Sequence, residues 1–339
     1  MRAVVYEHFG GPEVMHLVER PQPSPGSGEV VVRIALSGVN PTDWKSRRGP
    51  GQASAEPPFP QVVPNQDGAG TIAAVGDGVD PKRVGQRVWV WEAAWQRAEG
   101  TAQELLALPA DHTVPLPTGA SLELGASLGI PALTAHRCLT VAEAGPRQLE
   151  PGALEGRSVL VAGGAGAVGH AAIELALWSG ARVVTTVSSA AKATLARAAG
   201  AEQVVDYRSQ DAARALRSLH PQGIDIIVEV APCANAELDQ SILAGQGTIA
   251  AYASDAESLS LKVRAGMVGN ARYQFILVYT EPEAAKRQAL ADVAAAVAAG
   301  ALRVGEEAGL PLHRFPLERA PEAHAAVEGN AVGKVLIET

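Results

Sequence analysis

The chain has little cysteine and no surplus of positive charge. Its 339 residues include two cysteines, Cys138 and Cys233, which form neither a Cys-x-x-Cys pair nor a cluster with histidine. A disulfide framework or a structural zinc site is therefore not expected. The net charge is −8, which argues against nucleic acid as a partner, because nucleic-acid-binding proteins carry a basic footprint.

Long apolar runs are missing as well. No run reaches the roughly 18 residues that a membrane-spanning helix needs, and Met1–Glu7 is typical of a strand rather than of a signal peptide. With 47% hydrophobic and 19% charged residues, the composition is typical of a soluble, folded enzyme. We therefore expect a cytoplasmic protein without membrane contacts, and the length favours two domains of about 100–200 residues each.

Glycine is abundant, and one glycine-rich stretch organises the chain. The apolar run Val159–Ala162 predicts a buried strand, and the apolar residues from Val168 onward repeat with a helical period. Between them, Gly164-Ala-Gly-Ala-Val-Gly169 matches Gly-x-Gly-x-x-Gly in the strand-to-helix setting that the motif requires. Such a loop holds a dinucleotide pyrophosphate at the helix N-terminus; the alternative is a glycine-rich turn that binds nothing. The candidate binding residues of the loop are Gly164, Ala165, Gly166, Ala167 and Val168.

The middle of the chain alternates between strand and helix patterns. This alternation predicts an α/β fold with a doubly wound parallel sheet covered on both faces. Before residue 120, short strands and Pro/Gly turns predict a mostly antiparallel β domain. The strands predicted for the parallel sheet are Val159–Ala162, Arg182–Val187, Gln203–Asp206, Asp225–Val230 and Gly247–Ala251. The predicted helices lie at about 167–179, 190–199, 209–219 and 235–244.

The last part of the chain predicts a strand, an alanine-rich helix and a return to the β domain. The run Tyr273–Tyr279 has high β propensity and no charge. As an exposed edge it would be an aggregation hazard, so we expect it to pair with its symmetry mate in a homodimer. The helix Pro282–Ala299 follows. The helix Arg319–Glu328 and the strand Gly333–Glu338 are then expected to rejoin the β domain.

A series of short segments spans nearly the whole chain: Phe9–Val14, Gly38–Pro41, Asp67–Gly70 with Val75-Gly76, Asp111–Val114, Gly129–Pro131 with Thr134-Ala135, Gly163–Gly169, Gly223–Glu229 and Gly333-Lys334. Taken in order, they resemble the medium-chain dehydrogenase/reductase superfamily, and within it the zinc-free quinone oxidoreductases related to zeta-crystallin. The resemblance implies a GroES-like β domain from residues 1–122 and 281–339. It also implies a Rossmann NADPH-binding domain from residues 123–280.

The positions that hold metal ligands in zinc-dependent relatives carry other residues here. They are Asn40, Gln66-Asp67 and Ile130. One carboxylate and two amides do not make a zinc site, so the resemblance implies a reductase without zinc. Without a Lewis acid, such an enzyme reduces acceptors that take a hydride readily, such as quinones or activated alkenes, and the cofactor carries the chemistry.

Asn40 and Asp43 are the candidate catalytic residues. The resemblance implies that the Asn40 amide donates to the oxyanion that develops on a reduced quinone; the alternative is an Asx turn before a proline. Asp43 is either a proton shuttle or the cap of the short helix that follows. Trp44, Trp91 and Trp95 supply either an aromatic wall for the substrate or ordinary core packing.

The residues after the second Rossmann strand favour NADPH over NADH. NAD-binding folds usually place Asp or Glu there to accept the ribose hydroxyls, and a carboxylate would repel a 2′-phosphate. Here Arg182–Val187 is followed by the small donors Ser188 and Ser189, and Lys192 lies one turn into the next helix. Lys192 can bind the phosphate as a point charge, with a merely solvated lysine as the alternative. Tyr207 can add a phenolic donor.

By resemblance, further residues line the cofactor. Thr134 is a candidate nicotinamide contact, with an ordinary helix-face hydroxyl as the alternative. Lys334 is a weaker candidate, because an exposed lysine near the C-terminus is usually only solvated. The remaining candidates are Asn235, Ala251, Tyr252, Ser254, Phe275 and Ile276.

Together these features predict an NADPH-dependent, zinc-independent reductase of quinones that acts on a small molecule. An enoyl-thioester or 2-enone reductase on the same scaffold stays open, because the residues do not decide the acceptor. A non-catalytic NADPH-binding protein with a structural or regulatory role is the alternative from another class.

Overall fold

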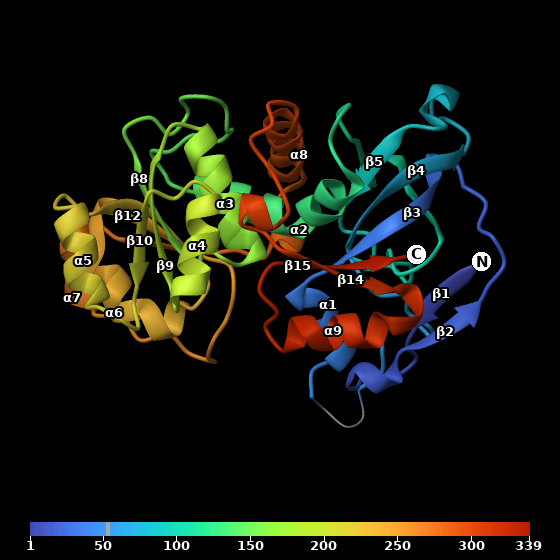
Figure 1. Cartoon of the computed structure of the whole chain (residues 1–339), viewed down its shortest axis with the longest axis horizontal. Coiled ribbons are helices and arrows are strands. Elements are labelled where there is room, and N and C mark those ends of the chain that lie inside the picture. Colours follow the sequence, from blue (N-terminus) through green and yellow to red (C-terminus); the bar gives the residue numbers. More distant parts are fainter. Residues whose placement is uncertain (52–54) are drawn as a thin grey trace. The chain divides into compact units, whose positions relative to one another are not determined.

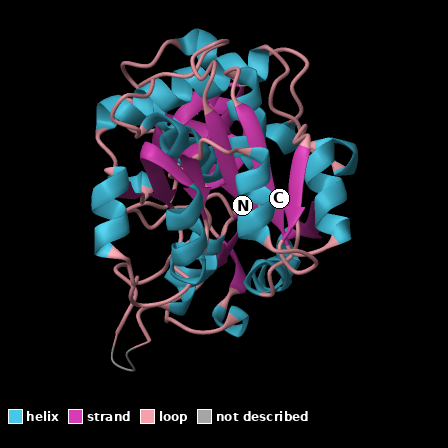
Figure 2. Cartoon of the chain, turned by 90° about the vertical axis from the view of Figure 1, so that its left-hand side faces the viewer, coloured by secondary structure: helices cyan, strands magenta, loops and turns pink. Residues whose placement is uncertain are grey.

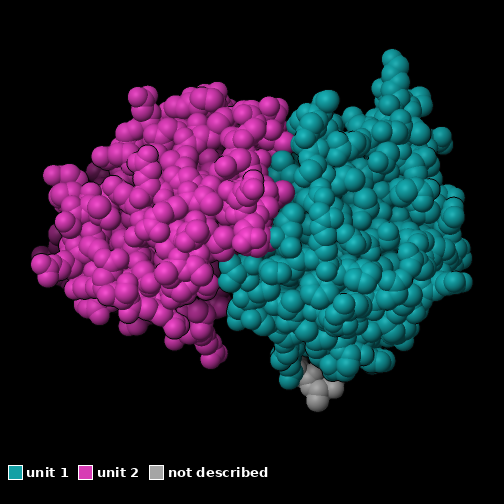
Figure 3. Space-filling view, in the orientation of Figure 1, with its two compact units in different colours: residues 1–130, 312–339 teal, residues 131–311 magenta. Residues whose placement is uncertain are grey.

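The computed structural model describes residues 1–51 and 55–339. These residues form two compact units, 1–130 with 312–339 and 131–311 (Figure 3). The predicted division at 122/123 and 280/281 differs, since 123–130 fall in the first unit and 281–311 in the second. Helix α8 (Glu283–Ala298) explains the second difference, because its Asp292 accepts hydrogen bonds from His136 and from the backbone N–H of Leu149.

A six-stranded parallel sheet forms the centre of the second unit (Figure 1). Its order is β10-β9-β8-β11-β12-β13, and each neighbouring pair is parallel. The central strands are rich in apolar residues and largely buried, as a sheet covered on both faces requires. The predicted α/β fold is confirmed. The strands are β8 (Ser158–Ala162), β9 (Arg182–Val187), β10 (Gln203–Asp206), β11 (Ile224–Glu229), β12 (Leu243–Ala251) and β13 (Arg272–Phe275).

Helices lie on both sides of this sheet (Figure 2). From β8 the chain runs through α3 and α4 to β10, and then through α5 and α6 to β11 and β12. Because such crossovers are right-handed, the reversal of direction places the two pairs of helices on opposite faces. It also creates a switch point, where open α/β sheets bind ligands. The helices are α3 (Ala167–Trp178), α4 (Ala190–Ala198), α5 (Ala212–Leu219), α6 (Pro232–Ile242) and α7 (Val263–Gly269).

The edge strand β13 is shorter than predicted. The strand ends at Phe275, and a turn of 3-10 helix follows at Val278–Thr280. The side chains of Ile276, Val278 and Tyr279 are buried. Apart from the half-exposed Leu277, the apolar residues of this second half therefore reflect core packing and not an exposed strand.

A seven-stranded, mostly antiparallel sheet forms the first unit. Its order is β14-β15-β3-β4-β5-β7, with β6 paired to β3, and β1 and β2 make a separate antiparallel pair. The predicted β domain and the return of the C-terminal strand are confirmed, since β15 pairs with β3. The strands are β1 (Arg2–Val5), β2 (His16–Glu19), β3 (Glu29–Val39), β4 (Asp67–Val75), β5 (Arg87–Val90), β6 (Leu105–Pro109), β7 (Thr113–Pro115), β14 (Leu312–Pro316) and β15 (Lys334–Glu338).

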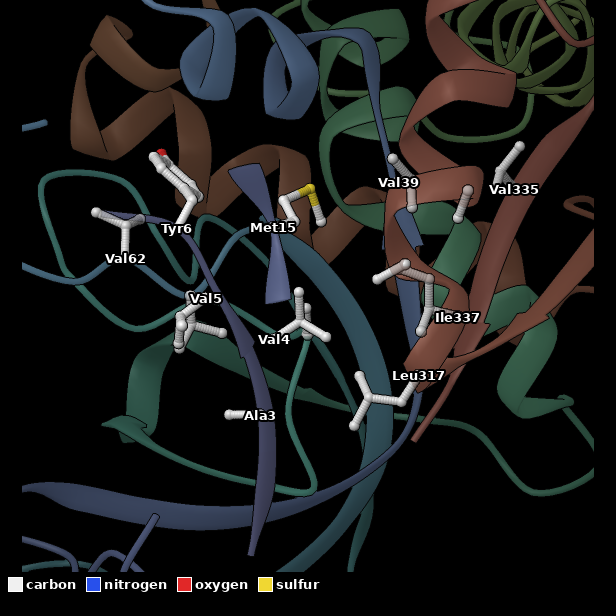
Figure 4. Packing of buried hydrophobic residues seen from close by; sticks show 14 residues of the cluster. Ala3, Val4, Val5, Tyr6, Met15, Val39, Val62, Leu317, Val335 and Ile337 are labelled. Atoms are coloured by element: carbon white, nitrogen blue, oxygen red, sulfur yellow. The ribbon is translucent and has the colours of Figure 1, made fainter. Parts of the chain in front are cut away.

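The first and last segments of the chain pack together in this unit (Figure 4). Val4 and Val5 of β1 share a buried cluster with Leu317 and with Val335 and Ile337 of β15. Complete burial of such a side chain stabilises the fold by roughly 1.5–3 kcal/mol. The unit is therefore closed by residues from both ends of the chain, and helix α9 (Ala320–Glu328) packs against β15.

Two further helices frame the site described below. Helix α1 (Pro41–Arg48) follows β3 directly. Helix α2 (Leu122–Thr140) is interrupted at Gly129, whose φ of −6° and ψ of −112° are not helical. Within residues 1–51 and 55–339, no helix combines the length and apolar character that crossing a bilayer demands.

Candidate active site

Strand register in the first unit brings three distant polar residues together. Strand β15 runs antiparallel to β3 with Val335 opposite Val39, so Lys334 lies beside Asn40, which follows β3. Strand β4 pairs with the other edge of β3 and places Asp67 opposite Gly38. The backbone ladders thus position Lys334, Asn40 and Asp67 in one cluster.

The three side chains form a continuous buried network. Lys334 Nζ donates to Asn40 Oδ1 at 2.7 Å and lies 3.6 Å from Asp67 Oδ2. Asn40 Nδ2 donates to Asp67 Oδ2 at 2.7 Å, and the backbone N–H of Ile130 donates to Asp67 Oδ1 at 2.9 Å. The alternative of a solvated Lys334 is wrong, because this lysine is 1% exposed.

Burial disfavours the charged forms of Asp67 and Lys334, whereas the contact between the two side chains favours these charged forms. Removal from water raises the pKa of Asp67, while Lys334 and the hydrogen bonds from Asn40 and Ile130 lower it. Burial lowers the pKa of Lys334, against the attraction of Asp67 and Asp43. Each charge therefore depends on its partner, since an unpaired buried charge is strongly unfavourable.

Asp43 takes the capping role that the sequence offered as one of two alternatives, and the proton-shuttle role stays a prediction. It lies in the first turn of α1, and its Oδ2 accepts a 2.6 Å hydrogen bond from the backbone N–H of Asn40, which closes a capping box. Its other oxygen, Oδ1, is buried without a hydrogen-bond partner. Burial and the Asp67 carboxylate raise the pKa of Asp43 to about 8. Asp43 is therefore both a helix cap and a buried acid that keeps its proton at neutral pH.

A cavity of about 690 Å³ in the first unit reaches Asp43. Aromatic rings and prolines make much of its wall, which suits a planar apolar molecule. Of the three tryptophans named from the sequence, Trp95 lines this cavity. Trp91 is buried and stacks on His112, and Trp44 lies outside the lining near Lys45. The aromatic lining residues are Tyr6, Phe9, Phe59 and Trp95, and polar ones include Asp43, Asn65, Gln66 and Arg97.

In the second unit, the glycine loop has the shape that a phosphate cradle requires. Gly163 makes the turn with φ of 73°, one position before the motif itself. A Cβ on Gly169 would lie 2.4 Å from Gly163 O, so helix α3 can approach the loop only without a side chain there. Gly166 precedes α3, and a Cβ there would meet only the carbonyl oxygen of Gly163, at 3.5 Å. The first N–H groups of the helix, which lack intrahelical partners, are thus accessible to an anion.

The candidate phosphate contacts converge at the end of β9. Ser189 caps helix α4 by accepting from the backbone N–H of Lys192, and Lys192 Nζ donates to Ser188 Oγ at 3.2 Å. Tyr207 follows β10, the neighbour of β9, and its N–H donates to Val187 O. Its side chain is half exposed. The four residues predicted to surround the 2′-phosphate therefore follow the neighbouring strands β9 and β10.

The other cofactor candidates of this unit follow the same edge of the sheet. All six strands are parallel, so their carboxyl ends share one side, where α/β sheets bind ligands. Asn235 donates to Glu229 at the end of β11, and Ala251 pairs with Phe275 at the ends of β12 and β13. Thr134 is buried on α2. Ala165 is buried in the loop, and Ala167 and Val168 open α3; Tyr252, Ser254 and Ile276 follow their strands.

Sequence reasoning missed the partnership of Lys334 and the cavity lining. Asp67 entered the sequence argument only as a lost metal ligand, although Asn40, Ile130 and Lys334 all face its buried carboxyl group. The signal available was its place in Asp67-Gly-Ala-Gly70 directly before an apolar strand. Among the described residues, no group of three or more His, Cys, Asp or Glu side chains is arranged to hold a metal ion.

Known protein families match both units. Residues 26–118 match the alcohol dehydrogenase GroES-like domain, and residues 167–301 match the zinc-binding dehydrogenase domain. The human quinone oxidoreductase is 30% identical over 342 residues, covering 99% of this chain and 97% of that protein. The human synaptic vesicle membrane protein VAT-1 homolog is 30% identical over 254 residues, or 74% of this chain and 61% of that protein.

Solved structures resemble this chain over its full length. A mycobacterial protein, Rv1454c, solved in complex with NADPH, has a TM-score of 0.81 at 28% identity over the full length of both chains. The Escherichia coli quinone oxidoreductase, at 23% identity and a TM-score of 0.80, shares the fold. The chain is thus an oxidoreductase of the nicotinamide-dependent type, and it belongs to the medium-chain dehydrogenase/reductase superfamily, among the relatives of the quinone oxidoreductases.

Proposed function

We propose that this protein is an NADPH-dependent reductase of quinones that works without zinc. The observation that carries the proposal is the buried carboxyl of Asp43, which lines an aromatic cavity of the first unit and accepts a hydrogen bond from the backbone N–H of Asn40. Quinone oxidoreductases among the relatives support the acceptor class, and the NADPH complex of a 28% identical protein supports the cofactor.

The residues of the second unit fit NADPH. The Gly163–Gly169 loop lets the backbone pack closely at the start of α3, where the helix N-terminus can hold a pyrophosphate. Ser188, Lys192 and Tyr207 present two hydroxyls and an ammonium for the 2′-phosphate, with no carboxylate among them. When bound, NADPH supplies the hydride.

The residues of the first unit can stabilise the negative charge that forms on the quinone and can supply the proton that completes the product. A quinone that accepts a hydride becomes a hydroquinone anion, and one proton completes the product. The second N–H of the Asn40 amide, which the hydrogen bond to Asp67 does not use, can donate to the negative oxygen. Asp43 holds the proton to deliver, because its raised pKa keeps the carboxyl neutral at pH 7.

The cluster already contains a cation, which supports a centre without metal. Lys334 Nζ touches Asn40 at one of the positions where zinc-dependent relatives hold ligands. An ammonium group at hydrogen-bond distance from Asn40 Oδ1 would repel a divalent ion there.

Steady-state turnover with NADPH tests the proposal. We expect quinones to be reduced faster than 2-enones of similar size, and we expect a chelator to leave the rates unchanged. A preference for 2-enones or enoyl thioesters would transfer the function to the alternative reductase. Loss of activity in the chelator would contradict the metal-free centre, and no turnover with any acceptor would contradict the catalytic role.

A further inference from the structure

The Asn40 amide lies between two groups of opposite chemistry. Lys334 Nζ is 2.7 Å from one end of the amide, and Asp67 Oδ2 is 2.7 Å from the other. An ammonium only donates and a carboxylate only accepts, so the carbonyl oxygen must face Lys334 and the nitrogen must face Asp67. The amide cannot turn around without placing two donors together and two acceptors together.

Two glycines make room for this arrangement. A Cβ on Gly38 would lie 3.1 Å from Cε of Lys334 and 2.1 Å from the carbonyl oxygen of Ala126. A Cβ on Gly129 would lie 1.9 Å from Oδ1 of Asp67. Asp67 is fully buried and Lys334 is 1% exposed. The backbone on both sides is therefore shaped to admit the charged pair, at the point where helix α2 is interrupted.

We propose that Lys334 is a positioning residue: together with Asp67 it locks the Asn40 amide so that its second N–H faces the oxygen that becomes negative. The inference rests on the proposed function, in which Asn40 donates to the acceptor. Lys334 acts only through Asn40, and this role replaces the cofactor contact predicted from the sequence.

The competing role for Lys334 is purely structural, as the counter-ion of Asp67. Lys334→Met alone does not separate the two, because it leaves a buried carboxylate without its cation and destabilises the fold. The double variant Lys334→Met with Asp67→Asn removes both charges together. If the oxygen of the new amide at position 67 keeps the N–H of Ile130, the NH2 group of that amide faces Asn40, and the Asn40 amide then turns to accept with its oxygen.

The experiment compares these two variants with wild type by urea unfolding, by kcat and KM for a good quinone, and by the dissociation constant for NADPH. We expect the single variant to lose stability and kcat. We expect the double variant to regain stability while kcat stays at least tenfold below wild type, with NADPH affinity changed less than twofold. Recovery of kcat together with stability would overturn the positioning role.

A spectroscopic readout keeps the test independent of turnover. In a proton–nitrogen NMR correlation spectrum, the side-chain amide signal of Asn40 is identified by its loss in Asn40→Ala. We expect its downfield proton, bonded to the Asp67 carboxylate, to shift in the double variant, and an unchanged signal would refute the inference. Lys286→Met is the control, since Lys286 is a buried lysine of the second unit that donates to Tyr279 O. If wild type reduces no acceptor, the proposed function fails, and this signal still tests the positioning.

Discussion

Asn40 is buried, yet one of its two amide N–H groups remains for a ligand. We expect Asn40→Ala to lower kcat for quinones roughly a hundredfold, the usual scale for the loss of one donor to a developing oxyanion. The dissociation constant for NADPH should change less than twofold, because the donor acts on charge that develops only in the transition state. Stopped-flow and steady-state assays measure the rates, and unchanged turnover would remove Asn40 from the centre.

Asp43 makes stability depend on pH in a defined direction. Its pKa is about 8 in the folded protein and about 4 in an unfolded chain. Between these values the folded state holds a proton that the unfolded state releases, so stability falls as pH rises from about 4 to 8. Asp43→Asn keeps the oxygen that caps α1 but cannot ionise. Between pH 5 and 8, we expect wild type to lose about 4 kcal/mol relative to this variant.

Urea unfolding of both proteins at several pH values measures this difference. The comparison cancels titrations elsewhere in the chain, because both proteins share them. Parallel stability profiles would show that Asp43 is ionised in the folded protein at neutral pH, and the proton would then have to come from another group.

Lys192 should distinguish the two nicotinamide cofactors. A charge-assisted contact contributes roughly 1.5–3 kcal/mol, so Lys192→Ala should weaken NADPH binding about tenfold or more. NADH lacks the phosphate and should bind almost as before. Fluorescence titration gives both constants, with Arg197→Ala at the other end of α4 as the control. Equal losses for the two cofactors, or a wild type that prefers NADH, would contradict the assignment.

The positions of the site candidates follow from local patterns more directly in the second unit than in the first. Ser188, Lys192 and Tyr207 follow strands that can be read from local patterns, and parallel pairing then brings them together. The contact of Lys334 with Asn40 spans 294 positions. This contact depends on the pairing of β15 with β3, which no local sequence pattern specifies. For that reason the sequence did not show that Lys334 is buried.

Strands and helices show the same difference between features with a clear local sequence pattern and features without one. Strands β8 to β12 were predicted within a few residues, because central parallel strands are continuous apolar runs with sharp ends. Strands β2, β6, β7 and β14 were not predicted individually; β2 and β14 are short and carry mostly exposed or half-exposed side chains, and β7 has only three residues. Strand β13 was predicted to extend to Tyr279 but ends at Phe275, because β propensity does not distinguish a strand from a buried turn.

The interruption of helix α2 is an element that the centre requires. The break at Gly129 lets Asp67 reach the backbone N–H of Ile130. We expect Gly129→Ala to destabilise the protein by about 2–4 kcal/mol, because its Cβ would overlap Asp67 Oδ1 and displace a buried carboxylate. Gly245→Ala is the control, since a Cβ there meets no atom within 4 Å. Equal unfolding free energies for the two variants would contradict the steric argument.

At the scale of the whole molecule, apolar side chains gather near the β13 edge. Strand β13 pairs with β12 on one side only, and helix α7 packs against β12. The apolar residues of this region that are about half to three-quarters exposed are Val263, Met267, Val268, Phe275 and Leu277. An unpaired strand beside such a surface favours association.

We therefore propose that the protein is a homodimer joined at this edge. Its pairing segment is Arg272–Phe275, shorter than the sequence predicted, so the exposed side chains of α7 must contribute to the contact. In a two-fold symmetric dimer, a substitution appears in both subunits, so Val268→Glu would place two unpaired charges in the buried contact. This variant should therefore shift the protein to monomers. Val84→Glu, which changes an exposed valine of the first unit, should leave the dimer intact. Light scattering at micromolar concentration measures both, and a monomeric wild type would contradict the proposal.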